Sequence, residues 1–567
     1  MARPTLRVGN CSGFYGDRFS AVQEMLEGGP LDVLTGDYLA ELTMLILGRD
    51  RMKDPNTGYA KTFLRQMKAS LALAMSKKVK IVVNAGGLNP AGLAAAVRAV
   101  STELGVTAKV AHVEGDDLMA RASELGLGSP LTANAYLGAW GITECLKAGA
   151  DIVITGRVTD ASLVVGAAAA HFAWKRNDWN ALAGAVVAGH VLECGAQATG
   201  GNFAFFTEIE LGRPGFPIAE IEEDGSCIIT KHAHTGGAVT LDTVRAQIVY
   251  EIQTARYAGP DVTTRFDTVK VIQDGTDRVR IHDAVGEPPP PTLKVCLNHV
   301  GGFRNDASFI LVGLDIEAKA KLVRQQMEAA MTKQPAELIW NLMRTDREDA
   351  DEEARASAVL RVVAKDKDPS VVGRSFSGAA VELALSSYPG FTMTAPPGDG
   401  SPYGVYSAKY VPAGEVPHVA VLPDGTRVTI APSEETLPLA AVPAPALPPP
   451  FAATSDVVRV PLGKIIGARS GDKGGSANIG VWTRSAESFQ WLAHFLNVKK
   501  LQELLPETAQ FTVERHLLPE LQAINFVIEG ILGEGVSSSP RFDPQGKALG
   551  EWLRARHVDV PRALLAT

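Results

Sequence analysis

The feature that most constrains the fold is an alternation, over roughly the first 155 residues, of short apolar runs with longer segments of helical spacing. The apolar runs lie at residues 5–10, 31–37, 79–87, 108–117 and 151–157. Apolar strands that are separated by helices are typical of a parallel sheet with helices on both faces. We therefore expect a Rossmann-like, doubly wound α/β lobe over residues 1–202.

Ligands of such sheets bind beyond the carboxyl ends of the strands, so the polar residues that follow each run are the first candidates for a site. Arg157 comes directly after the last strand, where its guanidinium suits a carboxylate or a phosphate. Asp160 suits the same site or the cap of the next helix. The acidic cluster Glu114, Asp116 and Asp117 suits a magnesium ion or a helix cap, and we favour the cap. The residues expected to bind substrate at these strand ends are Asn10, Ser12, Asp37, Asn84, Asn89, Arg157 and Asp160.

The pattern changes beyond residue 202. Residues 203–430 contain short β-rich runs with Asp-Gly and Gly-Gly turns and one amphipathic helix, which predicts a second, α+β lobe of a core over residues 1–430. Residues 431–456 are rich in proline and alanine and predict an extended linker. Residues 457–567 alternate strand and helix signals, which predicts a small ferredoxin-like α+β domain.

The composition restricts the class of partner. A formal net charge of −8 argues against nucleic acid as the main partner, because phosphate binding needs a concentrated basic surface. No apolar run reaches the roughly 18 residues of a membrane helix. The first residues lack the apolar stretch of a signal peptide, and the five cysteines are too scattered for a disulfide framework. We expect a cytoplasmic protein and, from its size and glycine-rich loops, a homo-oligomer.

The segment at residues 189–202, GHVLECGAQATGGN, brings a histidine, a glutamate and a cysteine within five positions. His190 and Cys194 lie four positions apart, on one face of the helix that ends here. A zinc site would need further ligands, for which His232 and His234 are the nearest pair. A Cys194 nucleophile would lie at the carboxyl end of a helix, where the dipole disfavours a thiolate. Both interpretations stay open, and neither is favoured.

Glu193 is the favoured catalytic residue of this segment. It precedes a glycine-rich run that offers backbone N–H groups and the side chains of Gln197 and Thr199. A carboxylate beside oriented donors suits removal of a proton α to a thioester carbonyl, because the donors stabilise the enolate oxygen. The predicted catalytic group is Glu193, with His190, Cys194, Gln197 and Thr199 around it. A glutamate held in a buried turn is the alternative.

Two glycine-rich stretches are candidates for anion binding. Residues 9–18, GNCSGFYGDR, look like a strand-to-helix loop that cradles a phosphate, but the glycine spacing is not that of a dinucleotide site. Residues 468–480, ARSGDKGGSANIG, place cationic and hydroxyl side chains among four glycines, which predicts free backbone N–H groups around an anion. The residues expected to bind the phosphates of coenzyme A, or else a neighbouring subunit, are Arg469, Ser470, Lys473, Ser476 and Asn478.

Several long motifs resemble, in order, those of one known family. The segments at residues 8–18, 36–60, 83–92, 113–118, 149–163 and 189–203 resemble the acyclic terpene utilisation protein AtuA family. Residues 468–481 resemble the small ferredoxin-fold domain that accompanies AtuA-type proteins. The resemblance implies a part in the breakdown of branched, citronellol- and geraniol-type acids as coenzyme A thioesters. It implies no catalytic residue.

Together these features predict an enzyme of branched or terpenoid acyl-CoA catabolism, acting as a hydratase, an isomerase or another lyase on an unsaturated thioester. We expect the acyl-CoA as substrate and no covalently bound cofactor, since the chain has no redox or ATP motif. One alternative is a non-catalytic accessory subunit that binds pathway enzymes through the small domain. The other is a metal-dependent enzyme that uses His190, Cys194, His232 and His234.

Overall fold

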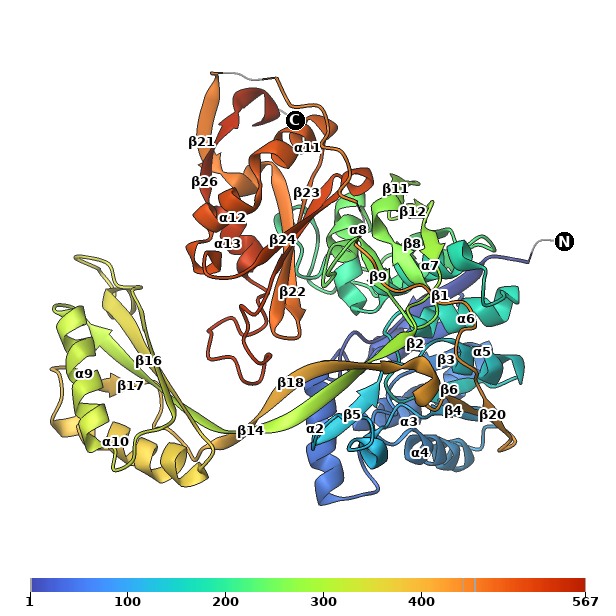
Figure 1. The fold of residues 1–567 in the computed structure, drawn as a ribbon, viewed down its shortest axis with the longest axis horizontal. Coiled ribbons are helices and arrows are strands. Elements are labelled where there is room, and N and C mark those ends of the chain that lie inside the picture. Colours follow the sequence, from blue (N-terminus) through green and yellow to red (C-terminus); the bar gives the residue numbers. More distant parts are fainter. Residues whose placement is uncertain (1–2, 442, 453–454, 566–567) are drawn as a thin grey trace. The chain divides into compact units, whose positions relative to one another are not determined.

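The computed structural model of the protein describes residues 3–441, 443–452 and 455–565. Its largest sheet has eleven strands in the order β11-β12-β8-β7-β1-β2-β3-β6-β4-β19-β20 (Figure 1). The parallel strands at its centre are β1 (Leu6–Asn10), β2 (Val33–Gly36), β3 (Lys80–Val83), β6 (Ile152–Thr155) and β4 (Val110–Glu114). Each coincides with an apolar run of the sequence, so the predicted doubly wound α/β arrangement is confirmed.

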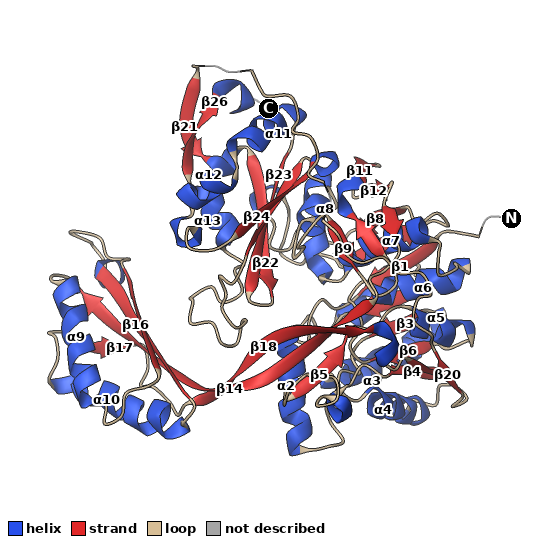
Figure 2. Cartoon of the chain, viewed as in Figure 1, coloured by secondary structure: helices blue, strands red, loops and turns tan. Residues whose placement is uncertain are grey.

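Helices pack on both faces of this sheet (Figure 2). They are α1 (Ala21–Gly28), α3 (Lys61–Lys77), α4 (Pro90–Glu103), α5 (Trp140–Lys147), α6 (Ser162–Phe172) and α7 (Trp179–Leu192). The helix α2 (Glu41–Lys53) packs instead in a small separate core with Leu39 and Leu88. Ile81 and Val83 of β3 lie in the core that contains residues of α1, α3 and α4. Val82, between them, lies in the core that contains residues of α5, α6 and α7. This two-residue alternation between two cores is why the strands are unbroken apolar runs.

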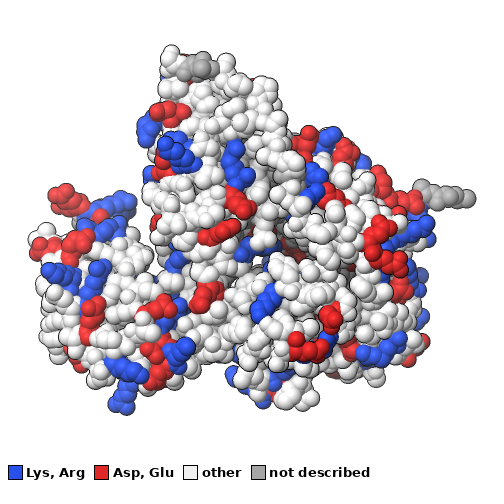
Figure 3. Space-filling view, in the orientation of Figure 1, with Lys and Arg blue, Asp and Glu red and all other residues white. Residues whose placement is uncertain are grey.

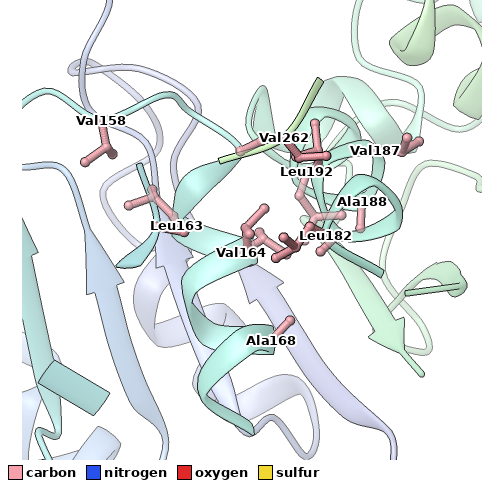
Figure 4. Close-up of a cluster of buried hydrophobic side chains, with 14 of the residues drawn as sticks. Val158, Leu163, Val164, Ala168, Leu182, Val187, Ala188, Leu192 and Val262 are labelled. Atoms are coloured by element: carbon pink, nitrogen blue, oxygen red, sulfur yellow. The ribbon is translucent and has the colours of Figure 1, made fainter. Parts of the chain in front are cut away.

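The contact between α6 and α7 forms part of the second core. Figure 4 shows Val164 and Ala168 of α6 pointing toward Leu182 and Leu192 of α7. All four side chains are buried. This packing fixes the carboxyl end of α7 relative to the sheet, and that end carries the residues of the 189–202 segment.

Strands from beyond residue 202 complete the same sheet. They are β7 (Pro217–Ile221), β8 (Cys227–Lys231), β12 (Val279–His282) and β11 (Lys270–Gln273) on the side of β1, and β19 (Val419–Val421) and β20 (Arg427–Thr429) on the side of β4. β7 runs antiparallel to β1, with Ile221 opposite Leu6. The expected boundary at residue 202 therefore does not separate two lobes, because a strand from beyond it pairs with the open edge of β1.

Four further elements lie around α7 and lead toward the site. They are the helix α8 (Leu241–Ile248) and the antiparallel strands β9 (Arg256–Ala258), β10 (Thr263–Arg265) and β13 (Val285–Glu287). Residues 246–252 look like a strand in the sequence, but residues 246–248 are the last turn of α8. The apolar face of α8 packs in the same core as α7, with Val244 and Ile248 buried.

Residues 299–405 and 537–544 form a second compact unit with its own core, so the separate α+β lobe is shorter than the predicted 203–430. Its strands are β15 (Glu337–Met343), β16 (Ser357–Asp366), β17 (Thr392–Met393) and the second half of β14 (Thr292–Val312). Its helices are α9 (Ile316–Ala330) and α10 (Phe376–Glu382). The first half of β14 pairs with β5 (Thr132–Ala135) of the first unit, and β18 (Ser401–Pro412) pairs with β14.

The C-terminal part of the chain is a small α+β arrangement that belongs to the same compact unit as the large sheet. Its antiparallel sheet has the order β22-β23-β25-β24. The strands are β22 (Ile466–Lys473), β23 (Ser476–Thr483), β24 (Val513–Leu518) and β25 (Ala523–Ile528), and β21 (Val457–Pro461) pairs separately with β26 (His557–Pro561). The helices are α11 (Ala486–Phe495), α12 (Val498–Leu504) and α13 (Leu549–Ala555).

The proline-rich linker forms neither helix nor strand in its described residues, 431–441 and 443–452. It contacts the first unit: the Leu437 N–H donates to the Pro289 carbonyl, and the Arg256 guanidinium donates to the Ala440 carbonyl. Within the part of the chain that the structure describes, no helix is long and apolar enough to cross a membrane. The cytoplasmic location and the homo-oligomer stay predictions.

The packing of α7 generates a test of the fold. A Cβ on Gly184 would lie 2.2 Å from the carbonyl oxygen of Gly225, in the turn between β7 and β8. We expect Gly184→Ala to lower the free energy of unfolding by about 1–3 kcal/mol, measured by urea denaturation. Gly378→Ala in α10 is the control, because an added methyl there meets nothing within 4 Å and alanine favours the helix. An unchanged unfolding midpoint for Gly184→Ala would contradict this packing.

Candidate functional site

A cavity of about 1100 Å³ lies at the carboxyl ends of the central parallel strands. Its wall includes Asp37 after β2, Arg157 after β6, Glu193 at the end of α7 and Lys473 at the end of β22. All of these residues belong to one compact unit. The cavity therefore lies at the edge of the sheet where the strand-end rule predicts a ligand site.

Acidic and basic side chains are interspersed, both on the surface and in the cavity. On the face of the molecule in Figure 3, Lys and Arg side chains alternate with Asp and Glu side chains. The charged residues that line the cavity include Asp37, Asp160, Glu193, Glu251, Arg157, Lys473 and Lys547. This mixture supplies groups for proton transfer together with cations for an anionic part of a ligand.

Glu193 occupies the position directly after α7, and its backbone N–H donates to the Gly189 carbonyl. The Asn10 amide at the end of β1 donates to the carbonyl oxygens of Leu192 and Glu193, so it joins the strand end to the helix end. Burial raises the pKa of the Glu193 carboxyl well above its usual range, Asp160 adds to the effect and the Lys473 ammonium opposes it. The carboxyl therefore keeps its proton to a higher pH than an ordinary glutamate does.

His190 is fully buried behind Glu193 and does not line the cavity. Its ring centroid lies 5.3 Å from that of Tyr257 and 5.4 Å from that of Phe266. Its Nδ1 lies 3.2 Å from Glu193 Oε1, without the angles of a hydrogen bond. Burial lowers the pKa of His190 to about 4, and the nearby Lys473 contributes. A neutral imidazole therefore lies next to the Glu193 carboxyl, outside the lining of the cavity.

Arg157 is engaged within the protein. Its Nη1 donates to Asp160 Oδ1 at 2.8 Å and to the Leu39 carbonyl at 3.1 Å, and its guanidinium lies 4.4 Å from the Tyr136 ring centroid. Burial opposes the charge of Arg157, but Asp160 and further nearby groups hold its pKa well above the usual range. Arg157 thus lines the cavity with its guanidinium already bound to the Asp160 carboxylate.

Asp37 and Asn84 act as a pair at the neighbouring strand ends. Asn84 Nδ2 donates to Asp37 Oδ1 at 2.6 Å, and Asn84 Oδ1 accepts from the Tyr38 N–H at 2.7 Å. Asp37 lines the cavity, whereas Asn84 lies behind it and is fully buried. Burial and the Asp160 charge raise the pKa of Asp37 well above its usual range. Asn84 therefore orients a cavity carboxyl instead of contacting the ligand space.

The 468–480 stretch is a β-hairpin and not an open phosphate loop. β22 and β23 pair from Ile466↔Thr483 to Lys473↔Ser476, with a two-residue turn at Gly474 and Gly475. The β23 half of the stretch uses its backbone in the ladders with β22 and β25, whereas the β22 half lies at the edge of its sheet. The free N–H groups predicted for the whole stretch are therefore limited to the outer edge of β22. Of the five residues predicted to bind an anion here, Lys473 lines the cavity.

The side chains of the other four residues form hydrogen bonds with the backbone of other segments of the protein. Arg469 donates to the Asn202 carbonyl at 2.6 Å, and Ser470 Oγ donates to the Lys547 carbonyl at 3.0 Å. Ser476 Oγ accepts from the Gly530 N–H at 3.2 Å, and Asn478 Nδ2 donates to the Val249 carbonyl at 2.8 Å. The predicted coenzyme A contacts of Arg469, Ser470, Ser476 and Asn478 are corrected accordingly.

The 9–18 loop borders the cavity, and part of its hydrogen bonding lies within the loop itself. Asp17 accepts from the N–H groups of Gly13 and Arg18 at 2.8 and 2.7 Å, and Ser12 Oγ donates to the Phe14 carbonyl at 3.0 Å. A Cβ on Gly13 would lie 2.6 Å from the carbonyl carbon of Cys194, so glycine is required for the loop to meet the end of α7. Asn10 and Ser12 therefore shape the site from behind, while residues 13–17 line it.

Three further predicted residues have structural contacts. Asn89 caps α4, with its Oδ1 accepting from the Gly92 N–H at 2.9 Å. Thr199 Oγ1 donates to the Gly215 carbonyl at 2.6 Å, outside the cavity, whereas Gln197 lines the cavity. Asp117 accepts from the Met119 N–H at 3.0 Å, at the start of a three-residue helical turn. Asp116 accepts from the Arg157 N–H and Glu114 pairs with Arg427, so the capping interpretation of the acidic cluster does not extend to these two residues.

Cys194 and the two later histidines do not form a metal centre with His190. His232 Nε2 lies 2.9 Å from the Met25 carbonyl, because β8 ends beside α1. Within the described residues no group of three or more His, Cys, Asp or Glu side chains is arranged to hold a metal ion, so the proposed four-residue site is wrong. Cys194 lines the cavity, where burial and the Glu193 charge raise its thiol pKa well above the usual range.

Sequence reasoning missed the wall formed by residues 250–257 and by Lys547. Tyr250, Glu251 and Tyr257 line the cavity, although none of them follows a strand of the parallel sheet. Lys473 lies 5.8 Å from the centroid of the Tyr257 ring, and Lys547 lies 5.1 Å from that of Tyr250. These cation and ring pairs join distant segments, so no local pattern in the sequence could reveal them.

The fold and the cavity define an α/β protein whose mixed acid and base site lies at the ends of its parallel strands and is completed by a small antiparallel domain. The chain belongs to the acyclic terpene utilisation family AtuA, which matches residues 6–422. The AtuA ferredoxin-like domain matches residues 460–559. Membership associates the protein with acyclic terpene utilisation. No curated protein and no solved structure matches the chain.

Asp116 supplies a pH-dependent test of the buried strand-end network. Burial raises its pKa to about 7, although the Arg157 N–H and Asn134 Nδ2 each donate to it at 2.8 Å. The folded state holds this proton more tightly than the unfolded state does. The contribution of Asp116 to the free energy of unfolding is therefore fully present below a pH of about 4. It falls as the pH rises toward 7, by roughly 4 kcal/mol for three pKa units. We expect Asp116→Asn to remove this loss, so its melting temperature should exceed that of the wild type increasingly from pH 5 to pH 8.

Asp424→Asn is the control for this measurement. Hydrogen bonds from Thr426 lower the pKa of the exposed Asp424 carboxylate, so its replacement produces no gain as the pH rises. Parallel melting curves for Asp116→Asn and the wild type across this pH range would contradict a protonated Asp116.

Proposed function

We propose that the protein is an enzyme of branched or terpenoid acyl-CoA catabolism that transfers a proton at the carbon α to the thioester carbonyl of an unsaturated substrate. A hydratase, an isomerase or another lyase fits this description. The observation that carries the proposal is the Glu193 carboxyl, which is buried at the cavity wall and has a pKa well above its usual range. A carboxyl poised near the working pH both gives and takes a proton efficiently.

The surroundings of Glu193 support this chemistry. Protonation of the α-carbon, or its reversal, passes through a state with negative charge on the thioester oxygen. Lys473 lines the same cavity and lowers the pKa of Glu193 by its charge, which indicates that its ammonium lies within electrostatic reach. The amide of Gln197 lines the same wall. In this proposal Glu193 handles the proton, while Lys473 and Gln197 stabilise the enolate oxygen.

The dimensions and lining of the cavity support a thioester with an apolar acyl chain. A volume of about 1100 Å³ exceeds the size of most sites for small metabolites. Leu39, Leu42 and Ile46, in and before α2, give one part of the wall an apolar character, and Leu293 and Leu439 add to it. In the proposed complex the hydrocarbon chain packs on these side chains, and the thioester lies beside Glu193.

The accessory-subunit alternative requires a small domain that is free to bind partners. The Trp482 indole donates to Asp242 at 3.2 Å, and Arg484 forms ion pairs with Asp242 and Glu208. These contacts hold the small domain against the core, and Lys473 places part of it in the cavity wall. The enzyme proposal uses both observations, whereas the accessory proposal uses neither.

The direct test follows deuterium incorporation at the α-carbon. The wild type is incubated in D₂O with branched, unsaturated coenzyme A thioesters and with their hydrated products. We expect exchange or turnover by the wild type and a loss of at least about 100-fold in Glu193→Gln, because the amide cannot accept the proton. Glu124→Gln changes an exposed glutamate and should leave the rate unchanged. Absence of exchange with every thioester, or an unimpaired Glu193→Gln variant, would overturn the proposal.

The direction of the Glu193 shift also sets the pH dependence. Removal of the α-proton needs the carboxylate, and burial moves its formation to higher pH. We expect the exchange rate of the wild type to go on rising at pH values where an ordinary glutamate is already fully ionised. A rate that is constant above pH of about 6 would show that the group responsible has an ordinary pKa.

A further inference from the structure

The segment of residues 249–253, between α8 and β9, carries an unusual backbone conformation into the cavity wall. Glu251 has a φ of 55°, in the left-handed region that a residue with a Cβ rarely adopts. Tyr250, Glu251 and Gln253 line the cavity. A strained residue of this kind persists only where the surrounding structure holds it, and such residues gather at functional sites.

Two buried asparagines of the C-terminal domain hold this segment. Asn478 of β23 accepts from the Glu251 N–H at 3.0 Å and donates to the Val249 carbonyl at 2.8 Å. Asn525 of β25 donates to the carbonyls of Ile252 and Gln253 at 3.1 and 2.9 Å. Asn478 also donates to Asn525 at 2.8 Å, so the two amides act as one clamp. Both side chains are fully buried, and their hydrogen bonds go to the backbone of a segment more than 220 residues earlier.

The glycines of the 468–480 hairpin make room for the same segment. A Cβ on Gly480 would lie 2.6 Å from the Val249 carbonyl oxygen. A Cβ on Gly471 would lie 3.0 Å from Cγ of Glu251 and 2.6 Å from the ring of Tyr250. These two glycines of the motif are therefore needed for a close approach between the hairpin and residues 249–251.

The Glu251 carboxylate pairs with a lysine of the cavity wall. Its Oε1 lies 3.7 Å from the Lys547 ammonium, and the Lys547 ammonium also contacts the Tyr250 hydroxyl. The charge of Glu251 contributes to the raised pKa values of Glu193 and Cys194, and all three residues line the same cavity. The clamp thus adds the Glu251 carboxylate to the cavity wall that also carries Glu193.

We infer that Glu251 is the second catalytic carboxylate of the site, and that Asn478 and Asn525 are positioning residues through which the C-terminal domain completes it. The inference rests on the proposed function. Hydration of an unsaturated thioester shows how two carboxyls share the work. Glu251 takes a proton from water as the water oxygen bonds to the β-carbon, the π electrons move toward the thioester oxygen, and Glu193 gives its proton to the α-carbon. Transfer of one proton from Glu251 to Glu193 through solvent restores both groups.

The experiment is a double-mutant cycle in the full chain. Glu251→Gln should lower kcat by at least about 100-fold with KM changed far less, because the group acts on the reacting water. Asn478→Ala should also lower kcat, by a smaller factor, and Asn525→Ala is a second, independent variant of the clamp. In the Glu251→Gln background, Asn478→Ala should have no further effect on kcat, because a positioning residue acts only through the group it positions.

Asn497→Ala is the matched control in the same domain. Asn497 caps α12, with its Oδ1 accepting from the Lys500 N–H at 2.9 Å, and it does not line the cavity. This variant should keep the wild-type kcat and reveal any general effect of a weakened domain. Equal losses from Asn478→Ala in the presence and absence of Glu251 would overturn the positioning role.

The outcomes separate this inference from the proposed function. An active wild type with an inactive Glu193→Gln and a fully active Glu251→Gln would overturn the role of Glu251 and leave the proposed function intact. A wild type without exchange or turnover on any thioester would overturn both. A loss of activity in Glu251→Gln that Glu251→Asp partly restores would support the second carboxylate.

Discussion

The hydrogen bonds from Asn10 to the carbonyl oxygens of Leu192 and Glu193 are the contact on which the site depends. They join the end of β1, at the centre of the large sheet, to the end of α7. Without a donor there, the last carbonyl groups of α7 would be buried and unsatisfied. Gly13 allows the next loop to close over the same helix end. The position of the Glu193 carboxyl is therefore set by the place of β1 in the sheet, because Asn10 at the end of β1 binds the end of α7.

The cavity concentrates ionisable groups that the protein interior normally excludes. Burial raises the pKa values of Asp37 and Glu193, and each such shift is free energy that the fold gives up at neutral pH. Arg157 compensates in part, since it binds Asp160 and lies over the Tyr136 ring. The burial of apolar side chains in the two cores offsets the free energy that the buried carboxyls cost. Perturbed groups that share one cleft are what proton-transfer chemistry requires.

Much of the first lobe could be predicted because its signals are local. The period of the apolar runs places Ile81, Val82 and Val83 in two cores, and the strand-end rule leads to Asp37, Arg157 and Asp160. The 468–480 hairpin could not be predicted in the same way. Glycines give a phosphate loop and a closely packed hairpin the same composition, and the difference lies in the partner strand β25. The place of Glu251 in the cavity wall could not be predicted for the same reason, because it depends on Asn478, which is 227 residues away in the sequence.

The clamp on residues 249–253 also has a consequence for the order in which the protein is made. A chain that emerges from its N-terminus completes all but the last two strands of the large sheet well before Asn478 and Asn525 exist. Domains fold largely as they emerge, so the core has time to assemble with one wall of its cavity still unsupported. The wall closes only when the segment that carries Asn478 and Asn525 has been synthesised and has folded. Biosynthesis itself thus delays the assembly of the complete site until well after most strands of the large sheet have been made.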